Sequence, residues 1–339
     1  MVIFLLERYL IVDFQGKGCT MNPPPIHGET THFSQTPTLE IVYAADDHYV
    51  VPLVAAISAL VESQKSEPYE MRVTVLANQM SPSNVELIEN LRTLGLSSEN
   101  LRVLDISDRI PEGLPSRSPH NTYISQTAYA RFLAPQLAQG SSDRILYLDA
   151  DTLVKGSLEP LLTLPLGGRP AAAVCDRIIE TVSHPQGLPN WRDLGLAPDA
   201  PYFNSGVLLM DCQLWRDEQI AERLYAYCFG RGDDLELFDQ EALNAVLGRE
   251  IVALDPEYNM FTNHLCNETV PGEAPLQRDP LSPEDIASAR IVHYIGHLKP
   301  WKPGDTASIE TDMFFEALDR TSLSGWRPTN VVTSSAGHE

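Results

Sequence analysis

The chain has 339 residues, with 46 acidic and 24 basic side chains, so its formal net charge at pH 7 is −22. Nucleic acids and anionic lipid surfaces are both bound through clustered Lys and Arg, and this charge balance argues against either partner. Hydrophobic residues make up 43% of the chain, which is enough for a sizeable buried core. We therefore expect a globular protein that neither binds nucleic acid nor inserts stably into a membrane.

The five cysteines are odd in number and widely scattered, and they contain no CxxC pair: Cys19, Cys175, Cys212, Cys228 and Cys266. Neither a disulfide framework nor a zinc ribbon fits this pattern. A reducing compartment is the simpler interpretation, so the sequence predicts a cytoplasmic protein.

The N-terminal segment contains two apolar stretches, Met1–Leu6 and Tyr9–Val12, separated by charged residues. Each is too short to span a bilayer, and neither a basic n-region nor a small-residue cleavage site is evident. We predict that residues 1–38 are a disordered extension and that translation starts at Met21. A weak amphipathic anchor is the alternative.

From Leu39 onward, strand-like and helix-like segments alternate. Apolar runs predict strands at Leu39–Ala45, Met71–Ala77, Leu101–Ile106, Arg144–Leu148, Ala171–Cys175, Gly206–Met210 and Ile251–Leu254. Spacing and start signals predict helices at Val54–Ser63, Ser81–Leu94, Ser125–Leu133, Trp215–Phe229 and Asp239–Leu247. This alternation indicates an α/β fold, with an open, mainly parallel sheet flanked by helices on both faces. We assign residues 39–302 to one domain and 303–339 to a C-terminal helix and flexible tail.

Polar residues gather at the ends of the predicted strands. Six acidic residues stand at or just after the predicted strand ends: Asp46, Asp47, Asp149, Asp151, Asp176 and Asp211. His293 stands at the end of a further segment, Arg290–Val292. In open α/β sheets, ligands bind outside the carboxyl ends of the strands. We therefore expect these side chains to line one site.

Asp149 and Asp151 are the first candidate metal ligands. Residues two apart in an extended segment point the same way, so both carboxylates can face one point. Such hard oxygen ligands suit Mn²⁺ or Mg²⁺, and a cation would remove their mutual repulsion at the mouth of a buried strand. His293 is a suitable third ligand, with Gly296 and Lys299 close behind it. Surface turns are the alternative explanation for each group.

Two further groups are less specific on their own. Asn204 precedes a predicted strand and could bond sugar hydroxyls, although an ordinary turn before a strand is the better explanation when this segment stands alone. Asp239 stands where a helix N-cap would stand, and capping explains it without any chemistry. Capping leaves the neighbouring Gln240 unexplained.

Read together, these segments resemble family 8 of the retaining glycosyltransferases, which includes glycogenin and the bacterial lipooligosaccharide galactosyltransferases. The bacterial branch is the closer resemblance. It spans about Glu40 to Lys302, and six motifs carry it in order: Ile41–Asp47, Tyr129–Arg131, Leu146–Asp151, Phe203–Leu208, Asp239–Gln240 and His293–Gly296 with Lys299–Trp301. Position 48 departs from the bacterial relatives, which often carry a small polar residue there. Their basic, aromatic C-terminal membrane patch is also missing.

The resemblance implies a glycosyltransferase catalytic domain of GT-A type (the nucleotide-diphospho-sugar transferase fold) that binds a UDP-sugar with Mn²⁺, with Mg²⁺ as the alternative ion. It assigns the metal to Asp149, Asp151 and His293. It places uracil and ribose at Ala44 and Asp46, with His48 nearby. It places the diphosphate at Gly296 and Lys299. It surrounds the transferred sugar with Arg131, Asp176, Asn204, Asp239 and Gln240, and among these the catalytic candidates are Asp239, Gln240 and Asn204.

The expected reaction is transfer of galactose or glucose, with retention, to a saccharide or glycoconjugate acceptor. Two routes stay open: Asp239 as a nucleophile, or same-face attack within an ion pair. A non-catalytic nucleotide-sugar-binding protein on the same fold is the alternative function. Neither the Gly-rich turn of a dinucleotide-binding oxidoreductase nor a phosphate-binding GxxxxGK[ST] loop is found. The irregular loops Ser183–Pro201 and Asn259–Pro283 are the expected sites of acceptor recognition.

Overall fold

The computed structural model describes residues 37–117, 125–138, 143–262, 282–296, 299–303 and 308–328. These described residues form one compact unit. The extension predicted over 1–38 lies outside the described residues except for its last two positions. Most of the predicted loop Asn259–Pro283 also lies outside them.

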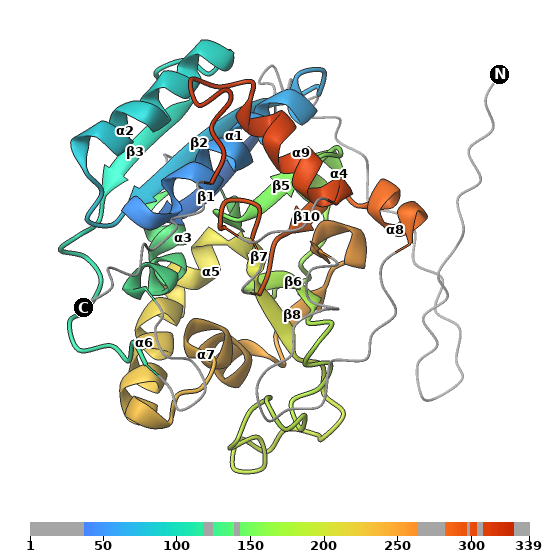
Figure 1. The fold of residues 1–339 in the computed structure, drawn as a ribbon. Coiled ribbons are helices and arrows are strands. Elements are labelled where there is room, and N and C mark those ends of the chain that lie inside the picture. Colours follow the sequence, from blue (N-terminus) through green and yellow to red (C-terminus); the bar gives the residue numbers. More distant parts are fainter. Residues whose placement is uncertain are drawn as a thin grey trace, which may run out of the picture. The chain divides into compact units, whose positions relative to one another are not determined.

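A seven-stranded sheet runs through the centre of this unit, in the order β3-β2-β1-β4-β7-β6-β8 (Figure 1). Its strands are β1 (Thr38–Ala45), β2 (Glu70–Ala77), β3 (Leu101–Asp105), β4 (Arg144–Asp149), β6 (Ala171–Cys175), β7 (Phe203–Asp211) and β8 (Ile251–Ala253). Every neighbouring pair is parallel except the two pairs that include β7. The structure thus confirms the predicted α/β class and its mainly parallel sheet.

Alternating side chains explain why helices cover both faces of this sheet. In β1, Ile41 and Tyr43 belong to one buried apolar cluster, whereas Val42 and Ala44 belong to another. Strands buried on both faces read as continuous apolar runs, as the central strands do here. The described helices are α1 (Val50–Gln64), α2 (Pro82–Glu89), α3 (Ala134–Leu137), α4 (Glu159–Thr163), α5 (Cys212–Asp217), α6 (Ile220–Arg231), α7 (Phe238–Leu247), α8 (Pro283–Ser288) and α9 (Ile309–Leu318).

The helices divide between the two clusters. Buried residues of α1 and α9 join the first cluster, and Figure 1 shows α9 running beside α1. Buried residues of α5, α6 and α7 join the second cluster, and these three helices gather together at the lower left of the same view.

A smaller sheet pairs β5 (Thr152–Val154), β10 (Ile291–His293) and β9 (Met260–Phe261), in the order β5-β10-β9. Because β5 follows β4 after a single turn, this sheet joins the main sheet at the point where Asp149 and Asp151 lie. The pairing of His293 with Thr152 brings the late segment of the chain to the acidic pair.

Three predicted helices differ from the observed ones. The segment predicted as the helix Ser81–Leu94 is α-helical over Pro82–Glu89 and continues as a 3₁₀ helix over Asn90–Leu94. The segment predicted as the helix Ser125–Leu133 is a 3₁₀ helix over Gln126–Leu133, with the Ser125 side chain accepting a hydrogen bond from the Thr127 amide. The single helix predicted at Trp215–Phe229 is wrong, because the chain breaks between α5 and α6. Gln219 lies at the break with φ 51°, in the left-handed region that a continuous helix excludes.

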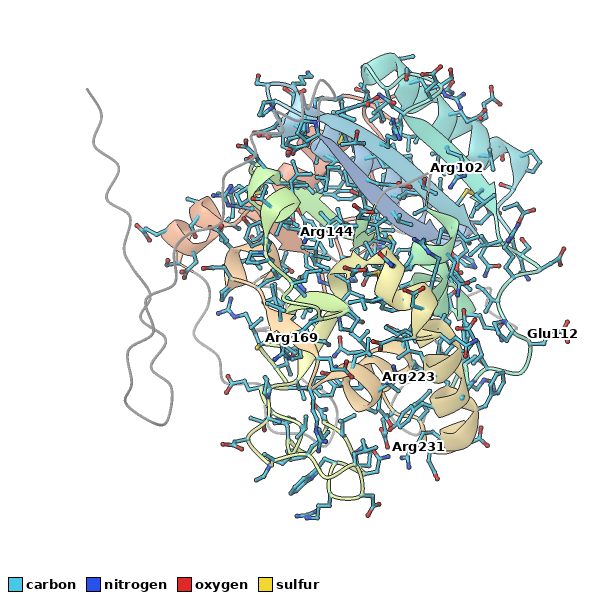
Figure 2. The ribbon with its side chains drawn as sticks, turned by 180° about the vertical axis from the view of Figure 1, so that it is seen from behind. Arg102, Glu112, Arg144, Arg169, Arg223 and Arg231 are labelled. Carbon is cyan, nitrogen blue, oxygen red and sulfur yellow. The ribbon has the colours of Figure 1, made fainter. Side chains whose placement is uncertain are left out.

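The arginines labelled in Figure 2 stand apart from one another on the far side of the molecule. Four of them donate to backbone carbonyls: Arg102 to Leu137 O, Arg144 to Leu164 O, Arg169 to Arg249 O and Arg231 to Asp234 O. These cations tie loops to neighbouring elements and do not form a common basic patch. Among the described residues, no helix is both long and apolar enough to cross a membrane.

The break at Gln219 leads to a stability prediction. Gln219→Gly should raise the free energy of unfolding by about 0.5–1 kcal/mol, because a left-handed residue with a Cβ costs roughly 1–2 kcal/mol, partly offset by the greater chain entropy of glycine. Gln213→Gly, inside α5, is the matched control and should lower it by about 0.5–1 kcal/mol. Equilibrium urea unfolding measures both values, and a loss of stability in both variants would contradict the prediction.

Candidate metal and nucleotide-sugar site

A cavity of about 850 Å³ opens at the edge of the sheet where β1 and β4 end. Many of its lining residues come from the segments singled out in the sequence, among them Ala44, Ala45, Asp46, His48, Arg131, Asp149, Asp151, Asn204, Asp239, Gln240, His293, Gly296 and Lys299. The parallel strands and the early turn after β4 bring most of these positions together.

The reversed direction of β7 decides which of its ends reaches the cavity. Asn204 lies at the start of β7 and lines the cavity, because β7 runs antiparallel to β4. Asp211 pairs with Arg144 at the opposite edge of the sheet, where its side chain caps α5 by accepting from the Leu214 amide. The expectation that Asp211 joins the site is therefore wrong.

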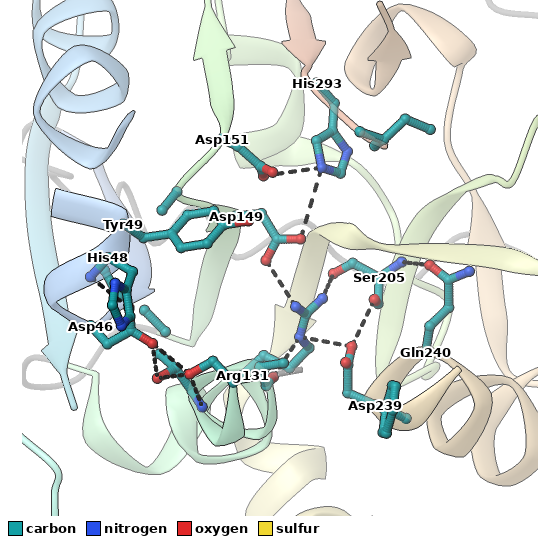
Figure 3. A pocket seen from close by; sticks show the side chains of 18 of the residues that line it. Asp46, His48, Tyr49, Arg131, Asp149, Asp151, Ser205, Asp239, Gln240 and His293 are labelled. Carbon is teal, nitrogen blue, oxygen red and sulfur yellow. Dashed lines mark hydrogen bonds and ion pairs between the residues drawn. The ribbon is translucent and has the colours of Figure 1, made fainter. Parts of the chain in front are cut away.

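The three predicted metal ligands converge in the cavity, as Figure 3 shows. One ligand atom from each of Asp149, Asp151 and His293 lies within 4.8 Å of the others. His293 Nε2 is 3.2 Å from Asp151 Oδ1 and 3.9 Å from Asp149 Oδ2. Two carboxylate oxygens and one imidazole nitrogen form a donor set that suits a divalent cation such as Mn²⁺.

Asp149 has one oxygen held by the protein and one directed at His293. Its Oδ1 accepts from Arg131 Nη2 at 2.9 Å and from the Tyr147 hydroxyl at 3.1 Å. Its Oδ2 is the atom closest to His293. Because the donors engage only Oδ1, Oδ2 is available to a metal.

Asp151 is neutralised by Lys299. The Lys299 ammonium donates to Asp151 Oδ2 at 2.8 Å and to the Tyr294 carbonyl, and the lysine is almost fully buried. Burial acts to raise the pKa of Asp151, but Lys299 and His293 together hold it well below its usual range. An ammonium has three protons to donate, so one remains for a phosphate oxygen.

Arg131 joins the metal site to Asp239. Its Nε lies 3.1 Å from Asp239 Oδ2, and its Nη1 donates to the Ser205 carbonyl at 2.6 Å. The Ser205 hydroxyl donates to the same Asp239 oxygen at 2.9 Å. Burial raises the pKa of Asp239, although Arg131 opposes the shift. For Arg131, burial acts to lower the pKa, but Asp149 and Asp239 outweigh it and keep the guanidinium charged.

The start of α7 corrects the capping interpretation of Asp239. The residue at the cap position is Leu237, which makes no side-chain cap, and Asp239 lies inside the helix. The preceding Phe238 is buried with φ 50°, a strained backbone for a bulky residue. This conformation sets the first turn of α7 against the cavity, with Asp239 directed at Arg131 and Ser205.

Asn204 and Gln240 form a network with Asp176. Asn204 Nδ2 donates to Gln240 Oε1 at 3.0 Å and to Asp176 Oδ2 at 3.2 Å, and Gln240 Nε2 donates to the same Asp176 oxygen. Asp176 is buried behind this amide pair and is not among the cavity-lining residues. Its contact with the cavity runs through Asn204 and Gln240.

The far end of the cavity holds Ala44, Asp46 and His48. Asp46 accepts from the hydroxyls of Ser125 and Thr127 and from the His48 amide. Asp47 turns away and accepts from Ser81 N and Asn84 Nδ2 at the start of α2. Of the two neighbouring acids, only Asp46 lines the cavity.

Several lining residues were not singled out in the sequence, among them Tyr49, Ser125, Thr127, Tyr147 and Ser205. Ser125 and Thr127 belong to an Ile-Ser pair and a Gln-Thr pair, which carry no recognisable pattern. Ser205 and Tyr147 stand inside motifs that were noted. Arg131 contacts both of them, at the Ser205 carbonyl and over the Tyr147 ring, and the motifs do not indicate these contacts. Asn259, counted only as the first residue of an irregular loop, accepts the hydrogen bond of His293.

Gly206 provides a test of whether the site fits a metal. A Cβ at this position would come within 2.8 Å of Asp149 Oδ2 and closer still to the His293 ring. The absence of a side chain at Gly206 thus leaves space between two metal-ligand candidates. Together with the donor set, this cradle fits a divalent cation held by Asp149, Asp151 and His293.

Comparison with known proteins agrees with this geometry. The family model described as glycosyl transferase family 8 matches residues 40–304. General stress protein A of Bacillus subtilis (strain 168) is 27% identical over 287 residues, covering 84% of this chain and 94% of the relative. Lipopolysaccharide 1,2-glucosyltransferase of Escherichia coli (strain K12) is 31% identical over 183 residues, but the match covers 52% of this chain and 49% of that protein.

A solved structure shares the fold. The galactosyltransferase LgtC, solved in complex with donor and acceptor sugar analogs, superposes with a TM-score of 0.66 at 28% identity. The match covers 84% of this chain and 96% of LgtC. The open sheet and the acid–acid–histidine cluster are those of a GT-A type glycosyltransferase. Within that class, the chain belongs to glycosyl transferase family 8.

The Gly206 cradle leads to a binding prediction. Gly206→Ala should weaken Mn²⁺ binding by about 10-fold or more, because the added methyl displaces His293 and Asp149 from their shared point. Gly230→Ala is the matched control, since a Cβ there meets nothing within 4 Å, and it should bind Mn²⁺ like the wild type. Titration of Mn²⁺ followed by electron paramagnetic resonance measures both. Equal affinity in the two variants would contradict the proposed cradle.

Proposed function

We propose that this protein transfers a hexose, galactose or glucose, from a UDP-sugar to a saccharide or glycoconjugate acceptor, with Mn²⁺ bound and with retention at the anomeric carbon. The observation that carries the proposal is the convergence of Asp149, Asp151 and His293 in one cavity with Lys299 and the Arg131–Asp239 pair. Family membership and the likeness to LgtC support the donor class, because that enzyme is named a galactosyltransferase.

Under this proposal, each part of the UDP-sugar donor is contacted by a different group of residues. Ala44, Asp46 and His48 line the end of the cavity assigned to uracil and ribose. Gly296 and Lys299 lie at the end assigned to the diphosphate, and φ 83° at Gly296 is accessible there because glycine has no Cβ. Asn204, Asp239 and Gln240 line the part assigned to the transferred sugar.

Departure of UDP places negative charge on its β-phosphate. A divalent ion held by Asp149, Asp151 and His293 would stabilise that charge as a Lewis acid. Lys299 supplies a nearly buried point charge with one proton still available, which strengthens its attraction to phosphate. Arg131 keeps Asp149 in place while it balances the charge of Asp239.

Asp239 and Gln240 set the environment of the anomeric carbon. Both Gln240 amide atoms are committed, with Oε1 accepting from the Ser205 amide and Nε2 donating to Asp176, so this side chain presents a fixed polar face. Asp239 Oδ2 is bound by Arg131 and Ser205. A nucleophilic role would therefore fall to Asp239 Oδ1, and same-face attack needs no nucleophile from the protein.

We propose that the protein acts in the cytoplasm, with a UDP-sugar as its donor. The described cysteines Cys175, Cys212 and Cys228 are free thiols, which a reducing compartment maintains.

Calorimetric binding of UDP, with and without Mn²⁺, is the first experiment. We expect binding that requires Mn²⁺, because the diphosphate and the acid pair repel each other until a cation lies between them. The same titration with EDTA is the control. Absence of binding in both conditions would contradict the shared diphosphate–metal site.

Asp149→Asn should abolish Mn²⁺-dependent turnover of the UDP-sugar, because the amide removes a charged ligand and half of the Arg131 ion pairing. Asp211→Asn is a matched control at the opposite edge of the sheet, where asparagine caps α5 as well as aspartate does. It should keep wild-type turnover. Near-normal turnover in Asp149→Asn would refute the metal assignment.

The non-catalytic alternative predicts different behaviour. A binding protein on this fold would retain UDP-sugar without consuming it, whereas the proposed enzyme should slowly hydrolyse the donor when no acceptor is present. Release of UDP in the presence of Mn²⁺, followed over hours by chromatography, separates the two functions.

A further inference from the structure

We infer that Asn259 is a positioning residue for the metal site: it fixes the proton of His293 on Nδ1, so that Nε2 is presented to Asp149 and Asp151. The inference rests on the metal site of the proposed function. It adds a residue that lies between the metal and the sugar-facing side chains. Asn259 is fully buried, and its Oδ1 lies 2.9 Å from His293 Nδ1.

The orientation of the Asn259 amide follows from its neighbour Asn204. The Gly206 amide donates to Asn204 Oδ1 at 2.9 Å, so this atom is an acceptor. Asn204 Nδ2 faces the Asp176 carboxylate at 3.2 Å, and only a donor suits that position. Two independent contacts thus fix which end of Asn204 carries oxygen.

The next step concerns Asn259 itself. Its amide group lies 2.8 Å from Asn204 Oδ1, and since that oxygen accepts, the Asn259 atom there is the donor Nδ2. The other end, facing His293, is therefore the acceptor Oδ1. The Gly206 amide and the Asp176 carboxylate thus orient Asn204, and Asn204 orients Asn259. Because Asn259 Oδ1 can only accept, His293 Nδ1 must carry the proton.

The backbone holds this arrangement from two sides. Asn259 follows a 3₁₀ helix at Pro256–Tyr258 and directly precedes β9, and His293 ends β10. β9 and β10 pair in parallel, with Phe261 opposite His293. The Phe261 ring also packs edge-on against the imidazole, with 5.8 Å between the ring centroids. These contacts restrict the ring, and the hydrogen bond to Asn259 selects which nitrogen faces the acids.

The consequence for binding follows from metal-site chemistry. A ring nitrogen must offer a lone pair to bind a metal, and the hydrogen bond at the opposite nitrogen determines which one does so. Loss of such an outer contact typically lowers metal affinity about 10–100-fold. The same network continues from Asn204 to Gln240, so disturbance of Asn259 reaches the sugar-facing amides as well.

The test measures Mn²⁺ affinity by electron paramagnetic resonance, without nucleotide or acceptor. Asn259→Leu, similar in volume but unable to accept, should bind Mn²⁺ about 10–100-fold more weakly. Asn259→Asp keeps an acceptor towards Nδ1 and should recover most of the affinity. Asn84→Leu is the matched control, because it removes an amide on α2 that donates to Asp47. This variant should bind Mn²⁺ like the wild type. Wild-type affinity in Asn259→Leu would overturn the inference.

A second measurement needs no variant at position 259. In ¹⁵N-labelled wild-type protein, the His293 Nδ1 resonance, identified by its loss in His293→Gln, should have the shift of a protonated ring nitrogen. A bare Nδ1 would overturn the inference even if Asn259→Leu fails to fold.

These two readouts also separate the inference from the proposed function. A wild type that binds Mn²⁺ with the expected Asn259 dependence, but neither binds UDP nor consumes a UDP-sugar, contradicts only the proposed function. A wild type that does not bind Mn²⁺ contradicts the metal assignment and, with it, the positioning role of Asn259. A wild type that binds Mn²⁺ with an unprotonated Nδ1 contradicts the inference alone.

Discussion

The buried guanidinium of Arg131 links the metal-binding side of the cavity to the side that faces the sugar. It bonds Asp149 through one nitrogen, Asp239 through another and the Ser205 carbonyl through the third. Burying these charges costs several kcal/mol per ion, and removing one partner of such a pair typically costs about 3–5 kcal/mol. The fold offsets that cost only while all three contacts are intact. Because Asp149 and Asp239 share the Arg131 guanidinium, a change in the position of either carboxylate affects the other.

The direction of β7 is the second constraint on the site. A parallel β7 would carry Asp211 to the cavity and leave Asn204 at the far edge. The antiparallel pairing with β4 and β6 reverses this and sets Asn204, Ser205 and Gly206 beside Asp149. The small sheet then brings His293 to the same point through its pairing with Thr152. The site is therefore built from segments about 50 to 140 positions apart, each of them held by backbone pairing.

Sequence reasoning succeeded where the pattern was local. Period-two spacing placed Asp149 and Asp151 together, and their convergence with His293 agrees with the motifs that indicated the family. It failed where the outcome depended on partners distant in sequence. Asp239 was expected at a helix cap, but it lies inside α7 and pairs with Arg131. Asp211 was expected in the site, but its strand runs in the opposite direction. The break at Gln219 was missed because its left-handed backbone has no glycine to mark it.

The sequence alone determined the α/β class, the order of most strands and helices, and the residue types available for metal and phosphate binding, because hydrophobic periodicity and short motifs are local properties of the chain. The tertiary structure decided which of those residues meet, which carboxylate oxygen stays free, and which nitrogen of His293 faces the acids. That last point shows the reason most clearly. The proton on Nδ1 is set through Asn259 and Asn204, which are 55 positions apart in the chain, and only folding brings them within hydrogen-bonding distance.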